Sequence, residues 1–220
     1  MDKATPYSQP QTWFSRLISL LTGSSNDDVD AILRALSEKL EAKDPHTLGH
    51  ADRVSQYAVE LGKVLGVHGS DLKTLRRGGL LHDIGKIAIP DAILLKPGKY
   101  TDEEFSIMKR HPILGCDICE NLRSIHDALP MIRHHHEKLN GTGYPDGLQA
   151  ESISPLVRIV TIVDIYDALR SRRSYKEPFS LDRSFEIMWD EVNKGWWDKA
   201  VLASWEKLVR SNHANQYPSA

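Results

Sequence analysis

The chain has 220 residues, of which 40% are hydrophobic and 26% charged, and its formal net charge is -2. That length supports one sizeable core and is short for two, so we expect one globular domain. A nearly neutral chain lacks the broad basic surface that nucleic-acid binding needs, so no nucleic-acid partner is expected and any phosphate must be held locally. The ten histidines are numerous for this length, and they are the residue type to explain.

Residues 1–26 are predicted to be a leader with one amphipathic helix, because Trp13, Leu17 and Leu21 recur at helical spacing. This apolar stretch is too short to cross a bilayer and Arg16 interrupts it, so we expect neither a membrane span nor an export signal. A cytoplasmic location follows. Three roles stay open for the helix, in decreasing order of expectation: docking on the domain, pairing two copies as a homodimer, and touching a membrane surface.

Apolar periodicity predicts helices in the rest of the chain and almost no strands, which indicates the all-α class. One domain is expected over residues 27–213, followed by a tail over 214–220. Thr101 and Glu104 form a capping box that predicts the start of a helix. The predicted helices cover about 27–41, 45–65, 70–82, 102–110, 113–121, 125–136, 155–171, 180–193 and 198–212, with loops over 90–98 and 141–155.

Ionisable groups in an apolar stretch give the first indication of function. The sequence His82-Asp83-Ile84-Gly85-Lys86 lies between Gly-Leu-Leu and Ile-Ala-Ile. Taking a charge out of water costs several kcal/mol unless the charge is paired or binds a metal. His82 and Asp83 are therefore predicted to bind one or more buried cations. Residues of the right chemical type follow downstream: His111, His135, His136 and Asp164.

The helix predicted over 155–171 is apolar around its whole circumference, which is typical of a helix buried in the middle of a domain. Two carboxylates lie in this aliphatic wall. We expect Asp164 to face a metal or a buried partner. Asp167, one turn along, either does the same or orients a ligand histidine.

Other histidines allow two interpretations each. His46 and His50 share a helix face, and a single histidine there is more often hydrogen-bonded than a ligand, although the context favours His50. His111, expected at the end of its helix, is either a ligand or a partner of the helix dipole. The run His134-His135-His136 cannot face one point, since successive helical residues turn by about 100°, so at most two share a site.

Two further features have ordinary structural interpretations. Cys116 and Cys119 form a single Cys-x-x-Cys pair without a second pair, so a zinc ribbon is not supported and two packing residues are expected. Gly141, Gly143 and Gly147 are predicted to be turn-makers that supply positive φ.

Several separated motifs, in the same order, resemble the HD-GYP family, a branch of the HD phosphohydrolase superfamily. They are His82 to Lys86 with Ile89-Pro90-Asp91, then His111-Pro112-Ile113-Leu114-Gly115, then His135 through Pro145, and the resemblance covers about residues 30 to 210. It implies an all-α HD-domain helical bundle with a dimetal centre between the helices. The implied activity is hydrolysis of cyclic di-GMP to pGpG by a metal-activated hydroxide, and a second cleavage to GMP stays open.

The resemblance also implies roles for individual residues. Asp83 would bridge two divalent ions, iron or manganese, and Lys86 would offset charge on the phosphate. Arg173 and Lys176 fall where family members meet substrate phosphate, and Tyr144 would wall the substrate pocket. The loop Gly143-Tyr144-Pro145 would dock diguanylate cyclase domains. The implied metal ligands are His50, His82 and Asp164 in one shell and His111, His135 and His136 in the other, with Asp83 shared.

The sequence also departs from the family pattern. Some members carry a glutamate four residues before the first ligand histidine and use it for a third metal, whereas this chain has His46, so a third ion stays open. Two other functions are weighed against hydrolysis: a sensor that binds cyclic di-GMP without cutting it, and a dimetal HD oxygenase. The sensor would be expected to have lost ligands, and the oxygenase has no use for Arg173 and Lys176. No base-reading residue separates cyclic di-GMP from cyclic GMP-AMP.

Overall fold

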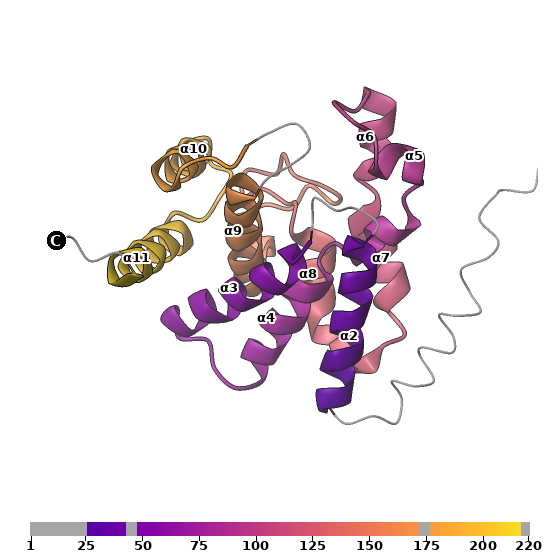
Figure 1. Ribbon diagram of the computed structural model, residues 1–220, viewed down its shortest axis with the longest axis horizontal. Helices are drawn as coiled ribbons and strands as arrows, with labels where there is room; N and C mark the ends of the chain where they lie inside the picture. Colours follow the sequence, from indigo (N-terminus) through magenta and orange to yellow (C-terminus); the bar gives the residue numbers. More distant parts are fainter. Residues whose placement is uncertain (1–25, 43–47, 172–176, 217–220) are drawn as a thin grey trace, which may run out of the picture.

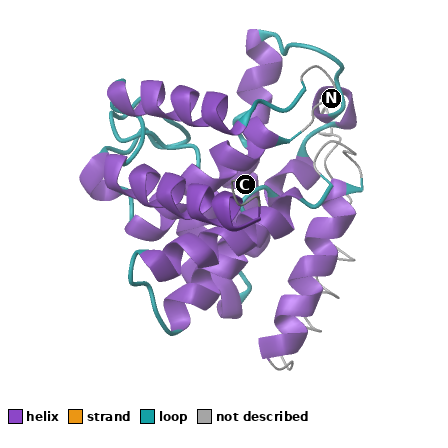
Figure 2. Cartoon of the chain, turned by 60° about the vertical axis from the view of Figure 1, so that its left-hand side comes forward, coloured by secondary structure: helices purple, strands orange, loops and turns teal. Residues whose placement is uncertain are grey.

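The computed structural model of the protein describes residues 26–42, 48–171 and 177–216 (Figure 1). The predicted N-terminal amphipathic helix, His46, Arg173 and Lys176 lie outside these residues. Within the described ranges the chain is helical, and Figure 2 draws no strand there. The β structure of these residues is limited to one isolated bridge between Asn140 and Gln149. The predicted all-α class is confirmed. No helix in these ranges combines the length and apolar character that crossing a bilayer requires.

Most predicted helices occur close to their expected positions. The elements, in chain order, are α2 Asn26–Glu41, α3 His50–Val64, α4 Ser70–Leu81, η2 Ile84–Ala88, α5 Asp91–Leu94, α6 Asp102–Met108, α7 His111–Cys119, η3 Arg123–Ala128, α8 Leu129–His134, η4 Ala150–Ser152, α9 Pro155–Arg170, α10 Leu181–Asn193 and α11 Lys199–Gln216. Those named η are single turns or short runs of 3₁₀ helix.

Helix α9 is the centre of the bundle and contacts α3, α4, α8, α10 and α11 (Figure 1). Val160 and Val163 are completely buried, as are Leu61 on α3 and Met188 on α10. Each such side chain contributes about 1.5–3 kcal/mol relative to an exposed one. The prediction of a central helix over 155–171 is therefore confirmed, and α9 carries its carboxylates into the middle of the domain.

Helices α5 and α6 form an arm with a small apolar cluster of its own, in which Ile89, Leu94 and Met108 are buried. The arm projects from the bundle beside α7 (Figure 1). Thr101 caps α6 as predicted. Its hydroxyl accepts a hydrogen bond from the amide of Glu104, and the carboxylate of Glu104 accepts one from the amide of Thr101. The arm leads directly into α7 and so fixes where that helix begins.

Four of the predicted element assignments are wrong. Helix α3 begins at His50 and not at residue 45, because Gly49 has φ 71°, a left-handed conformation outside the helical region. The stretch 90–98, expected as loop, contains the short helix α5. His111 opens α7 and does not end the preceding helix, so the dipole interpretation of its role, which requires a helix C-terminus, is also wrong. The segment expected as one helix over 125–136 is split into η3 and α8.

Candidate metal centre

Five separate stretches of chain bring their imidazoles and carboxylates to one place. We call His50, His82 and Asp164 the first donor group, and His111, His135 and His136 the second donor group; Asp83 contacts both. These residues come from the start of α3, the turn between α4 and η2, the start of α7, the residues after α8, and the middle of α9. The structure therefore brings together all seven residues that the sequence singled out as ligands.

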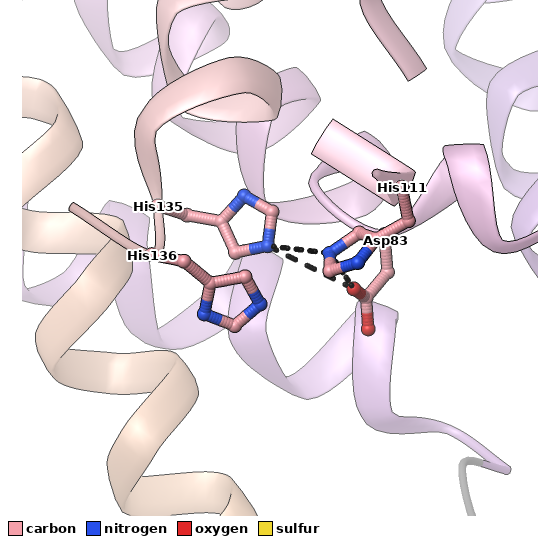
Figure 3. A group of neighbouring side chains, drawn as sticks. All are labelled: Asp83, His111, His135 and His136. Carbon is pink, nitrogen blue, oxygen red and sulfur yellow. Dashed lines mark hydrogen bonds and ion pairs between the residues drawn. The ribbon is translucent and has the colours of Figure 1, made fainter. Parts of the chain in front are cut away.

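Two histidines of the second donor group face one oxygen of Asp83, and His136 lies beside them (Figure 3). The Nε2 atom of His111 lies 3.2 Å from Asp83 Oδ1, and that of His135 lies 3.8 Å from the same oxygen. The two Nε2 atoms are 3.2 Å apart. His136 packs against His135 with 4.1 Å between ring centroids. One donor atom from each of these four residues lies within 4.8 Å of the others, which is a spacing that a single cation can span.

The first donor group lies on the other side of Asp83. His50 Nε2 is 3.3 Å from His82 Nε2 and 3.3 Å from Asp164 Oδ1. The second oxygen of Asp83, Oδ2, is 3.5 Å from His82 Nε2 and 4.0 Å from His50 Nε2. Each carboxylate oxygen of Asp83 thus faces a different group of donors, which is the arrangement of a residue shared between two cations.

The hydrogen bonds of the rings show that these donors suit a cation. The Nδ1 atoms of His82, His111 and His135 donate to the carbonyls of Gly79, Met108 and Ile132 at 2.8, 2.9 and 3.0 Å. A carbonyl only accepts, so each Nδ1 carries the hydrogen and each Nε2 presents a lone pair. His111 and His135 therefore direct two lone pairs at each other. Asp83 Oδ1 is buried, and no hydrogen-bond donor among the described residues reaches it. A divalent cation would satisfy all three atoms.

Charge differs between the two groups. Burial alone would lower the pKa of His50, but hydrogen bonds to Asp164 and Asp167 raise it to about 9. Burial lowers the pKa of His136 to about 3, with His111 adding to the effect. Burial would raise the pKa of Asp83, but the charge of Lys86 and the neighbouring imidazoles of His82 and His111 hold it well below its ordinary value. The first group is therefore the more anionic environment.

Asp167 takes the second of its two predicted roles. It accepts the Nδ1 hydrogen of His50 at 2.7 Å and so orients that ring toward the centre. Its carboxylate is held in turn by Arg53, whose Nε and Nη2 donate to the two oxygens at 2.6 and 3.0 Å. Sequence reasoning missed Arg53. The two residues are far apart in the chain, and the signal available was that a buried Asp167 needs a cationic partner.

Glu41 is a second residue that sequence reasoning missed. Its buried carboxylate accepts the amides of Gly49 and Ala51 at 2.6 and 2.7 Å, at the first turn of α3. Negative charge at a helix N-terminus is favourable. Glu41 therefore fixes the turn that carries His50.

The loop after His136 is organised by Glu137, which was also missed. This buried carboxylate accepts the amides of Asp146, Gly147 and Leu148. Tyr144 is thereby placed on His136, with 4.7 Å between ring centroids and an interplanar angle of 29°. The third histidine of the run, His134, points elsewhere and pairs with Asp146 at 3.0 Å, so two of the three share the centre, as the helical geometry required.

Glycines serve two different purposes around the centre. Gly141 and Gly147 have φ of 79° and 65°, as expected of turn-makers, whereas Gly143 is not among the glycines with positive φ. A Cβ on Gly143 would lie 2.4 Å from the backbone nitrogen of Lys138. Gly85 is tighter still, because a Cβ there would meet the carbonyl oxygen of His111. The prediction of positive φ at Gly143 is therefore wrong. Glycine is needed there because the backbone of Lys138 leaves no room for a side chain.

Lys86 lies at the edge of the centre. The ammonium of Lys86 pairs with Asp83 Oδ2 and is about a quarter exposed, so it lies at the solvent side of the centre.

The two cysteines lie outside the centre. Burial raises the pKa of Cys116 to about 11 and that of Cys119 to about 12, and neither belongs to a metal-binding cluster of the described residues. Their neutral thiols are those of packing residues.

Comparison with known proteins agrees with this arrangement. The HD domain family matches residues 34–201. The chain belongs to the HD domain family. It is 38% identical over 159 residues to the cyclic di-GMP phosphodiesterase response regulator RpfG of Xanthomonas campestris pv. campestris, which covers 71% of this chain and 42% of that protein. It is 37% identical over 165 residues to the 3'3'-cGAMP-specific phosphodiesterase 3 of Vibrio cholerae, covering 75% of this chain and 36% of the relative.

Solved HD-domain structures are also similar. The HD-GYP protein Bd1817 from Bdellovibrio bacteriovorus has the same fold, with a TM-score of 0.62 and 22% identity over 89% of this chain and 57% of that one. The cyclic GMP-AMP phosphodiesterase V-cGAP3 of V. cholerae matches 85% of this chain and 42% of its own with a TM-score of 0.54 and 29% identity. The resemblance to the HD-GYP branch is confirmed. The chain spans about two fifths of the length of the curated relatives named above.

Proposed function

We propose that this protein is a metal-dependent phosphodiesterase that hydrolyses cyclic di-GMP to pGpG, and further to GMP. The observation that carries the proposal is Asp83, whose two oxygens face two separate groups of buried nitrogen and oxygen donors. A centre of this kind suits an in-line displacement at phosphorus. The relatives named as cyclic di-GMP phosphodiesterases support the choice of substrate.

The residues would divide the work as follows. Divalent ions held by the two donor groups would lower the pKa of a bound water and polarise the phosphoryl oxygens. Asp83 would hold both ions through its separate oxygens. Lys86, paired with Asp83 at the solvent side, would offset negative charge that develops on the non-bridging phosphate oxygens. Arg173 and Lys176 would bind the substrate phosphates, and Tyr144 would wall the pocket beside His136.

We propose iron or manganese as the resident metal. Imidazole suits iron, while carboxylate ligands suit manganese, and this centre supplies both. The two donor groups imply two ions per chain. If His46 bound a third ion, metal analysis would give three ions per chain. Docking of a diguanylate cyclase domain on Gly143-Tyr144-Pro145, and pairing of two copies, stay predictions of the sequence.

A second substrate is favoured by a specific observation. Three relatives with 33% to 37% identity are named as 3'3'-cGAMP-specific phosphodiesterases. Cyclic GMP-AMP has the same phosphodiester ring with one adenine in place of a guanine, so the same centre can serve both. Cyclic di-GMP and 3'3'-cGAMP are therefore to be compared directly.

The experiment is chromatography of each cyclic dinucleotide after incubation with protein prepared without oxygen and loaded with iron or manganese. We expect loss of the cyclic compound and the appearance of the linear dinucleotide. Retention of the nucleotide on the protein without cleavage would make the protein a sensor. Neither binding nor cleavage would sink the proposal and leave a dimetal oxygenase as the alternative.

Substitution of Asp83 by alanine should remove both functions of that residue. We expect Asp83→Ala to lose metal from both donor groups and to lose the phosphodiesterase rate. Metal content per chain and product formation are measured on the same preparation. A folded variant that keeps both its metal and its rate would show that the assignment of Asp83 is wrong.

A further inference from the structure

A line of three aromatic rings leads from the second donor group to the protein surface. His136 is stacked on Tyr144 at 4.7 Å. Tyr144 in turn meets the ring of Phe105 at 6.5 Å between centroids and an interplanar angle of 80°. His136 and Tyr144 follow α8, whereas Phe105 comes from α6 on the arm. The arm and the loop after α8 therefore meet through these rings beside the metal centre.

Phe105 is placed where it does little for folding. It is 45% exposed, and it is the one aromatic residue among the large hydrophobic side chains that are exposed in the described ranges. It belongs to neither hydrophobic cluster, although Ile107 and Met108 on the same helix pack into the cluster of the arm. Phe105 therefore lies on a different side of α6 from the residues that hold the arm together.

A cation accompanies this ring. Lys109 lies one turn further along, and its ammonium is 5.1 Å from the centroid of the Phe105 ring. A positive charge beside an exposed aromatic ring attracts anionic ligands that carry flat rings, since the charge meets the phosphates and the ring meets the base. Surface phenylalanines without such neighbours are ordinary and need no ligand.

We propose that Phe105 and Tyr144 form a subsite for one purine base of the substrate. This inference rests on the proposed function, because it takes the phosphodiester to lie at the donor groups. The base then extends along the line of rings, with Phe105 as its outer contact and Tyr144 between Phe105 and His136. A purine stacks on such rings whatever its hydrogen-bonding edge, so this subsite accepts guanine and adenine alike.

The test separates base recognition from chemistry. Manganese-loaded protein is assayed with cyclic di-GMP and with methyl p-nitrophenyl phosphate, a diester without a purine. The variants are Phe105→Ala and Phe105→Trp. Leu95→Ala is the matched control, since Leu95 is 47% exposed on the same arm and belongs to neither hydrophobic cluster. The readouts are kcat, KM, metal content, thermal midpoint, and inhibition of the diester assay by GMP and by inorganic phosphate.

We expect Phe105→Ala to raise the KM for cyclic di-GMP about 5- to 100-fold, the usual loss for one stacked base. Its kcat, its metal content and its KM for methyl p-nitrophenyl phosphate should not change. GMP should inhibit this variant less strongly than it inhibits the wild type, while inhibition by phosphate stays the same. Phe105→Trp and Leu95→Ala should both resemble the wild type.

Two results would overturn the subsite. One is an unchanged KM for cyclic di-GMP together with unchanged inhibition by GMP. The other is a lower thermal midpoint with equal losses on both substrates, which would mark Phe105 as a packing residue. Failure of the proposed function looks different, because the wild type would then leave cyclic di-GMP intact, while direct binding of GMP and of inorganic phosphate, measured by calorimetry on the wild type and Phe105→Ala, still reports on the subsite.

Discussion

The two donor groups differ in the anchor of one histidine, although they share Asp83. In the second group, His111 and His135 are anchored by main-chain carbonyls of the turns just before them. In the first group, His82 has an anchor of the same kind, but His50 is anchored by the carboxylate of Asp167, which Arg53 holds from the other side. A carbonyl anchor comes with the local secondary structure, whereas a carboxylate anchor depends on a partner from another helix. The first group is therefore the one whose properties a single distant substitution can change.

The strongest test of this comparison is to remove the metal from each donor group separately. We expect His50→Ala to lose the metal of the first group and His135→Ala to lose that of the second, each retaining the other ion. The rate should fall by more than the roughly 10- to 100-fold that is typical when an outer partner of a metal ligand is lost. Metal content and the rate on cyclic di-GMP are measured together. Loss of all metal in both variants would mean that the groups do not bind independently.

Asp167→Asn should sharpen the difference between the anchors. The amide oxygen still accepts from His50, but the negative charge is gone, so we expect metal affinity in the first group to fall roughly 10- to 100-fold while the second group is unaffected. Thr161→Val is the matched control, since Thr161 also lies on α9 and its hydroxyl donates to the carbonyl of His135 at 3.0 Å. Competition with a metal chelator measures both affinities. Equal losses in the two groups would contradict the comparison.

A change of one pH unit should have the smallest effect. In the metal-free protein the pKa of His50 is about 9 and that of His136 is about 3. Below pH 9 metal must displace a proton from His50, so apparent affinity in the first group should fall about tenfold per unit as the pH drops, while His136 imposes no such competition. Titration of metal binding from pH 8 to pH 6 tests this. Parallel curves for both groups would contradict it.

The same pKa has a consequence for folding without metal. Because the folded-state pKa of His50 is raised, its protonated form stabilises the metal-free protein fully below the ordinary pKa of 6.5, and this contribution is lost as the pH rises through about 9. Thermal unfolding of metal-free protein should show the trend, with His50→Gln as the variant that removes it. If the thermal unfolding midpoint rose between pH 6.5 and pH 9 only in the protein that has His50, this prediction would be contradicted.

Much of the centre could be predicted because its ligands stand out locally. His82 and Asp83 are polar residues in an apolar stretch, and Asp164 lies in a helix that is otherwise aliphatic. Each of these signals needs only a few neighbouring residues. The run of three histidines could be reduced to two by helix geometry alone, and His134 is indeed turned toward Asp146.

Arg53 and Glu41, which support the ligands from further out, could not be found in this way. Arg53 is an ordinary residue in its own helix, and only packing of α3 on α9 makes it the partner of Asp167. Glu41 reads as the end of one helix, yet its carboxylate fixes the start of the next. The late start of α3 depends on a left-handed Gly49, and a glycine does not reveal its φ in the sequence.

Backbone contact at Gly85 has a consequence for the size of ion that the centre can accept. The turn carrying Asp83 and the first residue of α7 lie so close that no side chain fits between them. The gap between Asp83 and His111 is consequently set by main-chain atoms and persists whichever side chains surround it. To fit a larger cation, the distance between these two backbone segments must therefore be increased first, since exchanging the ligand side chains alone would leave the gap unchanged.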